Sequence, residues 1–294
     1  MKKTRIFGLS AALVTPFGPT GDPDLTRVVS HAKFVISGGC DSVTLFGTTG
    51  EGFGLSSHER RDILKAVSGA LSKDTPIGVG ILTCDIATAA EQALSAYAGG
   101  ASRLLMAPPF FMKNMGDDGL FAWYSAVFDR IGDALKNVIL YHIPSQTAVP
   151  ISVELVSRLR AAYPGVITGI KDSSGDWDTT QKYLAAHGDI SILVGDERQL
   201  PKAMANGAEG SICGVSNFLP GLLRKIIHEG ADARLLSGIV DMVVAGPVTP
   251  SVKVLTAHVS GDPDFIRVRP PLSQLPESAQ KALIQGYEAA MAKG

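Results

Sequence analysis

The chain alternates short apolar runs with longer segments in which apolar positions recur at helical spacing. Short apolar runs are typical of buried strands, whereas a recurrence every three to four residues is typical of a helix with one buried face. The pattern predicts eight strands, at residues 8–14, 42–46, 76–81, 102–106, 137–141, 166–170, 190–194 and 210–213.

Helix-like segments fill the gaps, for example at residues 26–37, 57–71, 86–98, 152–161 and 198–205. We expect Ser56 or Ser57 to cap the second of these, with Glu59 and Arg60 in its first turn. After about residue 218 the pattern is wholly helical, at residues 219–229, 233–244, 249–259 and 277–292. We therefore expect a barrel domain over residues 1–230, with the first of these helices as its eighth helix. A helical region over residues 231–294 should pack on this barrel.

Eight strand–helix units fit either a closed (β/α)8 barrel or an open doubly wound sheet. A dinucleotide-binding sheet would carry a G-x-G-x-x-G turn after its first strand. Here that strand is followed by Thr15, Pro16 and Phe17 instead. The strand count favours the (β/α)8, or TIM, barrel, with a C-terminal helical extension.

Charge and cysteine usage narrow the function. The net charge is -1 and no basic stripe is visible, so we expect a small-molecule ligand rather than a nucleic acid. The three cysteines (Cys40, Cys84 and Cys213) are far apart, which favours a reducing cytoplasm over a disulfide framework. No apolar run is long enough to suggest a membrane span. Residues 2–14 loosely imitate a signal peptide, but they read better as a first strand.

The candidate chemistry sits where strands end, because the active site of such a barrel lies at the C-terminal ends of its strands. Lys171 follows the sixth apolar run. A desolvated lysine loses its proton more readily, and the neutral amine attacks a ketone to form an imine, or Schiff base. An exposed lysine, or one paired with Asp172, is the alternative at this position. Tyr141 ends the neighbouring fifth run, where a phenol could carry protons.

The second strand runs into a turn of two glycines around two threonines, followed by Glu51. Backbone N–H groups and threonine hydroxyls in such a turn can hold a carboxylate. The histidines show no spacing typical of a metal site, so we expect no metal. Together these features indicate a 2-oxo acid as the ligand.

At these residues the sequence resembles the dihydrodipicolinate synthase / N-acetylneuraminate lyase family. The resemblance covers residues 6 to about 230, with a helical tail as in the family. It rests on residues 12–17 (ALVTPF), 47–51 (GTTGE), 108–111 (PPFF), 140–145 (LYHIPS) and 169–172 (GIKD).

The resemblance implies a role for each matching residue. Lys171 would form the Schiff base, Tyr141 would shuttle protons, and Thr48 would relay a proton to Tyr141 and, with Thr49, hold the pyruvate carboxylate. It implies no cofactor besides the lysine imine, and a homotetramer built from dimers. Further residues expected at the substrate site are Gly47, Gly50, Gln146, Ser173, Gly195, Glu197 and Ile212.

Several positions depart from the family pattern. Gln146 stands where the synthases carry an arginine for the carboxylate of aspartate semialdehyde, and glutamine offers no charged fork. Phe111 stands where they carry a tyrosine that reaches across the dimer, and His142 where asparagine is usual. Glu197 and Arg198 match the acidic pair of the sialic acid lyases only in part.

These features predict a lyase or aldolase that acts on pyruvate or a 2-keto-3-deoxy acid through a Schiff base. The first alternative is dihydrodipicolinate synthase itself, which condenses pyruvate with aspartate semialdehyde. The second is a non-catalytic relative that binds a 2-oxo acid, against which the complete set of Lys171, Tyr141 and Thr48 speaks.

Overall fold

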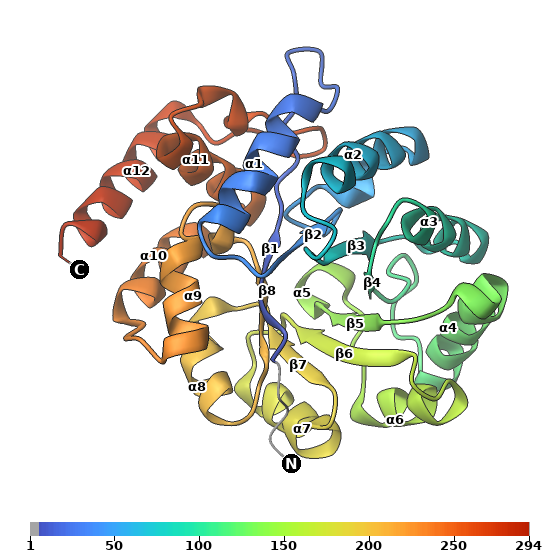
Figure 1. The fold of residues 1–294 in the computed structure, drawn as a ribbon. Coiled ribbons are helices and arrows are strands. Elements are labelled where there is room, and N and C mark those ends of the chain that lie inside the picture. Colours follow the sequence, from blue (N-terminus) through green and yellow to red (C-terminus); the bar gives the residue numbers. More distant parts are fainter. Residues whose placement is uncertain (1–5, 294) are drawn as a thin grey trace.

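The eight predicted strands pair in chain order, all parallel, and the eighth closes on the first. We describe this barrel from a computed structural model that covers residues 6–293 (Figure 1). The (β/α)8 expectation is confirmed. The strands are β1 Gly8–Ala12, β2 Ser42–Leu45, β3 Ile77–Ile81, β4 Arg103–Met106, β5 Val138–His142, β6 Ile167–Asp172, β7 Ser191–Val194 and β8 Gly210–Cys213. Lys2, Lys3 and Arg5, the charged residues of the signal-like segment, lie outside the described residues, and its apolar part contains β1.

Helices surround the barrel in Figure 1, and the predicted segments are among them. They are α1 Leu25–Ser37, α2 Ser57–Ala70, α3 Ile86–Ala98, α4 Asp117–Ile131, α5 Pro144–Thr147, α6 Val153–Ala162, α7 Trp177–His187, α8 Leu200–Ala205, α9 Pro220–Glu229, α10 Arg234–Val244, α11 Val248–Ser260 and α12 Glu277–Met291.

Side-chain caps fix where several helices begin. Ser56 caps α2 in a full capping box, since its hydroxyl accepts from the Glu59 N–H while the Glu59 carboxylate accepts from the Ser56 N–H. The helix predicted at residues 198–205 begins only at Leu200. Asp196 instead caps a 3₁₀ turn at Glu197–Gln199, and the helix starts with a proline in its first turn.

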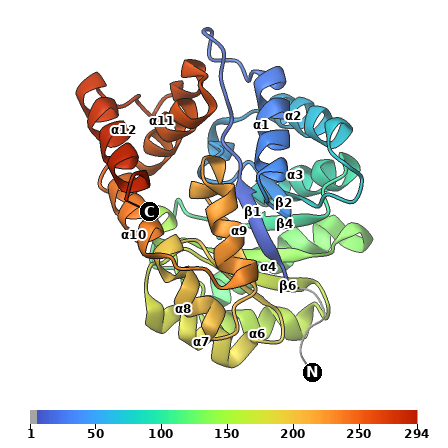
Figure 2. The same cartoon turned by 60° about the vertical axis from the view of Figure 1, so that its left-hand side comes forward.

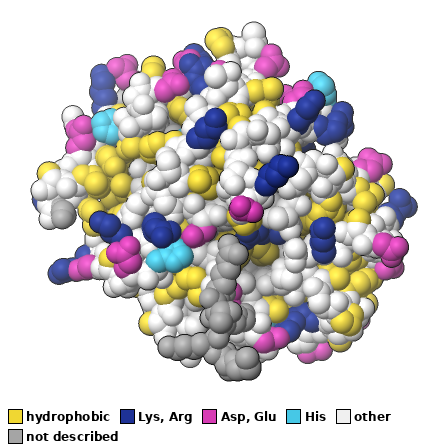
Figure 3. Space-filling model, viewed as in Figure 1, with side chains coloured by type: hydrophobic (Ala, Val, Ile, Leu, Met, Phe, Trp, Pro, Cys, Tyr) yellow, Lys and Arg dark blue, Asp and Glu magenta, His cyan; other side chains and the backbone are white. Residues whose placement is uncertain are grey.

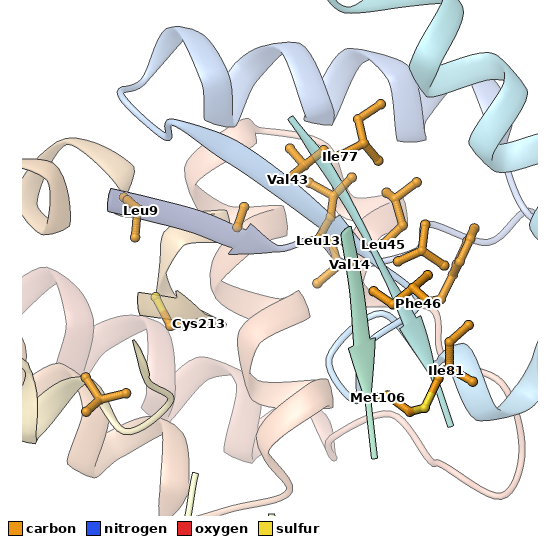
Figure 4. Packing of buried hydrophobic residues seen from close by; sticks show 14 of the residues in the cluster. Leu9, Leu13, Val14, Val43, Leu45, Phe46, Ile77, Ile81, Met106 and Cys213 are labelled. Carbon is orange, nitrogen blue, oxygen red and sulfur yellow. The ribbon is translucent and has the colours of Figure 1, made fainter. Parts of the chain in front are cut away.

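The two faces of each strand contribute to different packing layers. Outward side chains such as Val43 and Leu45 of β2 pack with Phe46 and Ile81 against the helices, as Figure 4 shows. Inward side chains fill the barrel and form a separate cluster. Its buried members are Ala12, Leu105, Ala107, Ile139, Tyr141, Ile143, Leu193 and Ile212. Because successive strand residues alternate between the faces, the register decides which side chains enter the barrel.

The helices that follow the barrel, α10, α11 and α12, lie together on one side of it in Figure 2 and pack on one another. On the face drawn in Figure 3, basic and acidic side chains are interspersed. Between residues 6 and 293, no helix is both long and apolar enough to cross a bilayer.

Candidate functional site

Lys171 and Tyr141 lie side by side on neighbouring strands and both point into the barrel. They are register partners between β5 and β6. Tyr141 belongs to the inward cluster. Both side chains are buried, with 5% of Lys171 and 2% of Tyr141 exposed. Parallel pairing at matched positions therefore brings together two groups that are 30 residues apart in sequence.

The phenol of Tyr141 lies between the lysine and a threonine. Lys171 Nζ donates to Tyr141 Oη at 3.3 Å, and Thr48 Oγ1 lies 3.2 Å from the same oxygen. The lysine nitrogen also lies 4.3 Å from the centroid of the tyrosine ring. A hydroxyl that contacts both groups can pass a proton between them, so the three side chains form a continuous path for proton transfer.

Asp172 does not pair with Lys171. Strand alternation places its carboxylate on the opposite face, where it accepts from the Thr180 hydroxyl at 2.7 Å and from the Ser174 N–H at 2.9 Å. The alternative of an exposed or Asp172-paired lysine is therefore wrong. β6 also continues for one residue beyond Lys171, so the lysine lies within the strand rather than in the loop that follows it.

The turn after β2 brings Thr48 and Thr49 to the mouth of the barrel. It is closed by hydrogen bonds from the Glu51 N–H to the Thr48 carbonyl and from the Gly52 N–H to the Gly47 carbonyl, at 3.0 and 3.1 Å. Gly50 is required for close packing, because a Cβ there would lie 2.6 Å from the Leu13 carbonyl oxygen. Gly47 and Gly50 are not among the residues whose atoms line the cavity, although both belong to the turn that carries Thr48 and Thr49.

A cavity of about 790 Å³ opens above these residues. This volume suits a small organic molecule. Of the predicted residues, it is lined by Thr48, Thr49, Tyr141, Gln146, Lys171, Ser173, Gly195, Glu197 and Ile212.

Gly195 and Glu197 have distinct environments in this wall. A Cβ at Gly195 would lie 1.9 Å from Ser173 Oγ and 3.1 Å from Lys171 Cε, so only glycine leaves room for the lysine. Burial raises the pKa of Glu197. The hydrogen bond of 3.0 Å that its carboxylate accepts from the Val215 N–H lowers this pKa and so opposes the effect in part. Glu197 therefore presents a buried carboxyl group to the cavity.

Nearly the whole length of the chain matches known proteins. The model of the dihydrodipicolinate synthetase family matches residues 5–289. The chain belongs to this family. An uncharacterized DapA-like lyase of Chloroflexus aurantiacus is 32% identical over 97% of both chains. The crystal structure of dihydrodipicolinate synthase from Agrobacterium tumefaciens is 44% identical and has a TM-score of 0.94, over 97% of this chain and 99% of the other.

YagE, a prophage protein of Escherichia coli K12 solved with pyruvate, has the same fold. Its TM-score is 0.87 at 23% identity, over 97% of this chain and 98% of the other. The predicted membership of the dihydrodipicolinate synthetase family, and with it an enzyme of the lyase type, is confirmed.

The positions that depart from the family pattern have different surroundings. Gln146 is exposed on α5 at the cavity wall, whereas Phe111 is 80% exposed and does not line the cavity. His142 faces away from the barrel interior, and its Nδ1 accepts from the Ile151 N–H at 3.0 Å. Arg198 donates to Asp196 and Asp241, and its side chain does not line the cavity.

One wall of the cavity was not predicted from the sequence. The C-terminal helices were expected only as an appended region, yet α10, α11 and the link between them line the site. Their contribution is mostly apolar and comes from Val240, Val243, Val244, Pro247, Val248, Thr249, Pro250 and Val252. Apolar side chains at helical spacing look the same whether they face a core or a cavity, so the pattern alone gives no signal for this wall.

Proposed function

We propose that this protein is a lyase that cleaves or forms a carbon–carbon bond of a 2-keto-3-deoxy acid through a Schiff base on Lys171. The contact of Lys171 and Thr48 with the Tyr141 phenol, inside a cavity of suitable size, carries this proposal. In the cleavage direction the neutral amine attacks the C2 ketone, and the resulting carbinolamine loses water to give an iminium.

The iminium then accepts the electron pair of the C3–C4 bond, while the C4 hydroxyl loses its proton and an aldehyde leaves. The enamine that remains takes a proton at C3, and water releases pyruvate from the lysine. Tyr141 is the group placed to carry these protons, with Thr48 beside it. The hydroxyls of Thr48 and Thr49 and the N–H groups of their turn would hold the carboxylate.

A second candidate is condensation of pyruvate with aspartate semialdehyde, favoured by the 44% identity to a protein named dihydrodipicolinate synthase. Gln146 at the cavity wall argues against it, since an amide cannot form the charge-assisted fork that an arginine offers a second carboxylate. The first candidate keeps the same lysine chemistry without requiring that charge.

The proposal includes pyruvate as the 2-oxo acid, in keeping with the pyruvate bound to YagE. We also propose that the protein forms a homotetramer, is located in the cytoplasm and uses no cofactor beyond the lysine imine. The resemblance to the family supports the assembly, and the widely spaced cysteines support the location.

The test is covalent trapping at Lys171. Pyruvate with borohydride should add one reduced adduct per chain, located on Lys171 by peptide mass spectrometry. Lys171→Ala should abolish the adduct, whereas Lys281→Ala should retain it because that lysine is exposed on α12. An adduct on another lysine, or none, would contradict the proposed function.

A further inference from the structure

Glu51 ends the turn that carries Thr48 and Thr49, but it does not line the cavity. Its backbone adopts the left-handed conformation with φ of 54°, and only 1% of its side chain is exposed. The proposed chemistry gives this buried carboxylate no task. It lies two residues after Thr49 in the same turn, which raises the question of what this carboxylate holds.

The C-terminal region satisfies both oxygens of Glu51. Oε1 forms an ion pair with Lys253 of α11, a side chain with no exposed surface. Oε2 accepts from the Arg269 N–H at 2.9 Å. Lys253 Nζ also donates to the Arg267 carbonyl at 2.5 Å and lies 4.5 Å from the centroid of the Phe17 ring. The turn and the C-terminal segment are therefore joined through a fully buried charge pair.

Other contacts fix the same turn from outside. The Thr15 hydroxyl donates to the Gly50 carbonyl at 2.7 Å, and the Thr249 hydroxyl lies 3.5 Å from the Thr48 carbonyl. Thr249 and Lys253 are four residues apart on α11, so they lie on one face of that helix. One helix face thus reaches both Glu51 and the backbone of Thr48.

A buried ion pair adds little stability compared with apolar residues of the same size, because both charges lose their hydration. It does demand an accurate mutual position of its partners, since an unpaired buried charge is strongly disfavoured. Burial lowers the pKa of Lys253, and the attraction of Glu51 opposes this effect. The pair is therefore better suited to fixing geometry than to adding stability.

We propose that Lys253 is a positioning residue for the reaction. Through Glu51 it fixes the turn, and so sets Thr48 against the Tyr141 phenol and Thr49 in the carboxylate-binding wall. The carboxylate of the 2-oxo acid is then bound by residues of the barrel, and α11 determines the position of the turn that binds it. This inference rests on the proposed function and deepens it.

The experiment compares Lys253→Met with Lys281→Met. The first removes the charge and keeps an unbranched stem, and the second breaks an exposed ion pair with Glu277 in the same region. For each variant, borohydride trapping at Lys171 is titrated with pyruvate. Lys253→Met should raise the half-saturating pyruvate concentration about tenfold or more, while trapping at saturation still reaches one adduct per chain. Lys281→Met should stay within twofold of the parent.

A charge left unpaired could prevent Lys253→Met from folding. The double variant Glu51→Gln, Lys253→Met removes both charges and should show the same rise in the half-saturating concentration. A folded single or double variant that traps pyruvate at the parent's concentration overturns the inference alone. Failure of both variants to give the parent's circular dichroism spectrum also overturns it, in favour of a purely structural pair. If the parent traps no pyruvate, the proposed function fails, and this inference with it.

Discussion

Tyr141 is the residue at which the separate parts of the site meet. Its oxygen contacts Lys171 Nζ and Thr48 Oγ1, which come from β6 and from the turn after β2. The strand pattern predicted that this side chain would end β5, and β5 in fact continues to His142. The position of the oxygen follows from inward orientation and register, and these depend on strand pairing rather than on local sequence.

Tyr141→Phe should lower the turnover of a 2-keto-3-deoxy acid by about 10²–10⁴-fold, because the ring remains and only the proton carrier is lost. Tyr124→Phe is the matched control. The Tyr124 hydroxyl is buried and has no hydrogen-bond partner within residues 6–293, so its loss should leave turnover unchanged. Steady-state kinetics with thermal unfolding of both variants would check this. Turnover of Tyr141→Phe within a few-fold of the parent would remove the phenol from the mechanism.

At the scale of elements, α5 brings Gln146 to the cavity wall. This helix has only four residues and begins with Pro144. The Thr147 hydroxyl oxygen lies 3.1 Å from the carbonyl oxygens of both Ile143 and Val149 and can donate to either, which stabilises this short helix. We therefore expect the acceptor aldehyde to contact Gln146, whose short helix has a fixed position.

Gln146→Arg should raise the specificity constant for aspartate semialdehyde by about 10–100-fold relative to a neutral aldehyde. A hydrogen bond to a charged group contributes about 1.5–3 kcal/mol, which corresponds to one to two decades. Arg198 should not supply this charge, because it is bound to Asp196 and Asp241. Gln146→Glu, with the opposite charge, should lower the same ratio. A parent that already uses aspartate semialdehyde as efficiently as a dedicated synthase would favour the second candidate function.

At the scale of the whole molecule, buried polar contacts join distant parts of the barrel. His31 of α1 is 2% exposed, and its Nε2 lies 2.9 Å from Asn217 Oδ1. The same oxygen accepts from the Val14 N–H at 3.0 Å, so the ring nitrogen must donate. Burial lowers the pKa of His31 to about 4, and the hydrogen bond with Asn217 opposes this only in part.

This pKa makes stability depend on pH. The unfolded chain binds a proton at His31 below about pH 6.5, whereas the folded protein binds it only near pH 4. Stability should therefore be complete above pH 6.5 and fall as the pH drops towards 4, by about 3 kcal/mol from this group. His31→Gln can still donate but does not titrate, so its urea unfolding should lose less stability between pH 7 and pH 4. His58→Gln, at an exposed position, should follow the parent. Equal losses in all three proteins would contradict the assignment.

The sequence by itself determined the order and approximate limits of the eight strands, because apolar runs and turn residues are local signals. It also indicated the residues at the strand ends, since parallel barrels expose those ends at one face. Lys171, Tyr141, Thr48, Thr49 and Ile212 all lie at the cavity. The family resemblance assigned roles to these residues, because its motifs occur at the matching positions.

The tertiary structure decided what depends on contacts between distant segments. It turned Asp172 away from Lys171, held Arg198 in salt bridges and left Phe111 exposed. It also made α10 and α11 a wall of the cavity and buried Lys253 against Glu51, 202 residues earlier in the chain. Local pattern cannot specify such pairings, because an apolar or charged side chain has the same sequence signature whether its partner is solvent, core or active site.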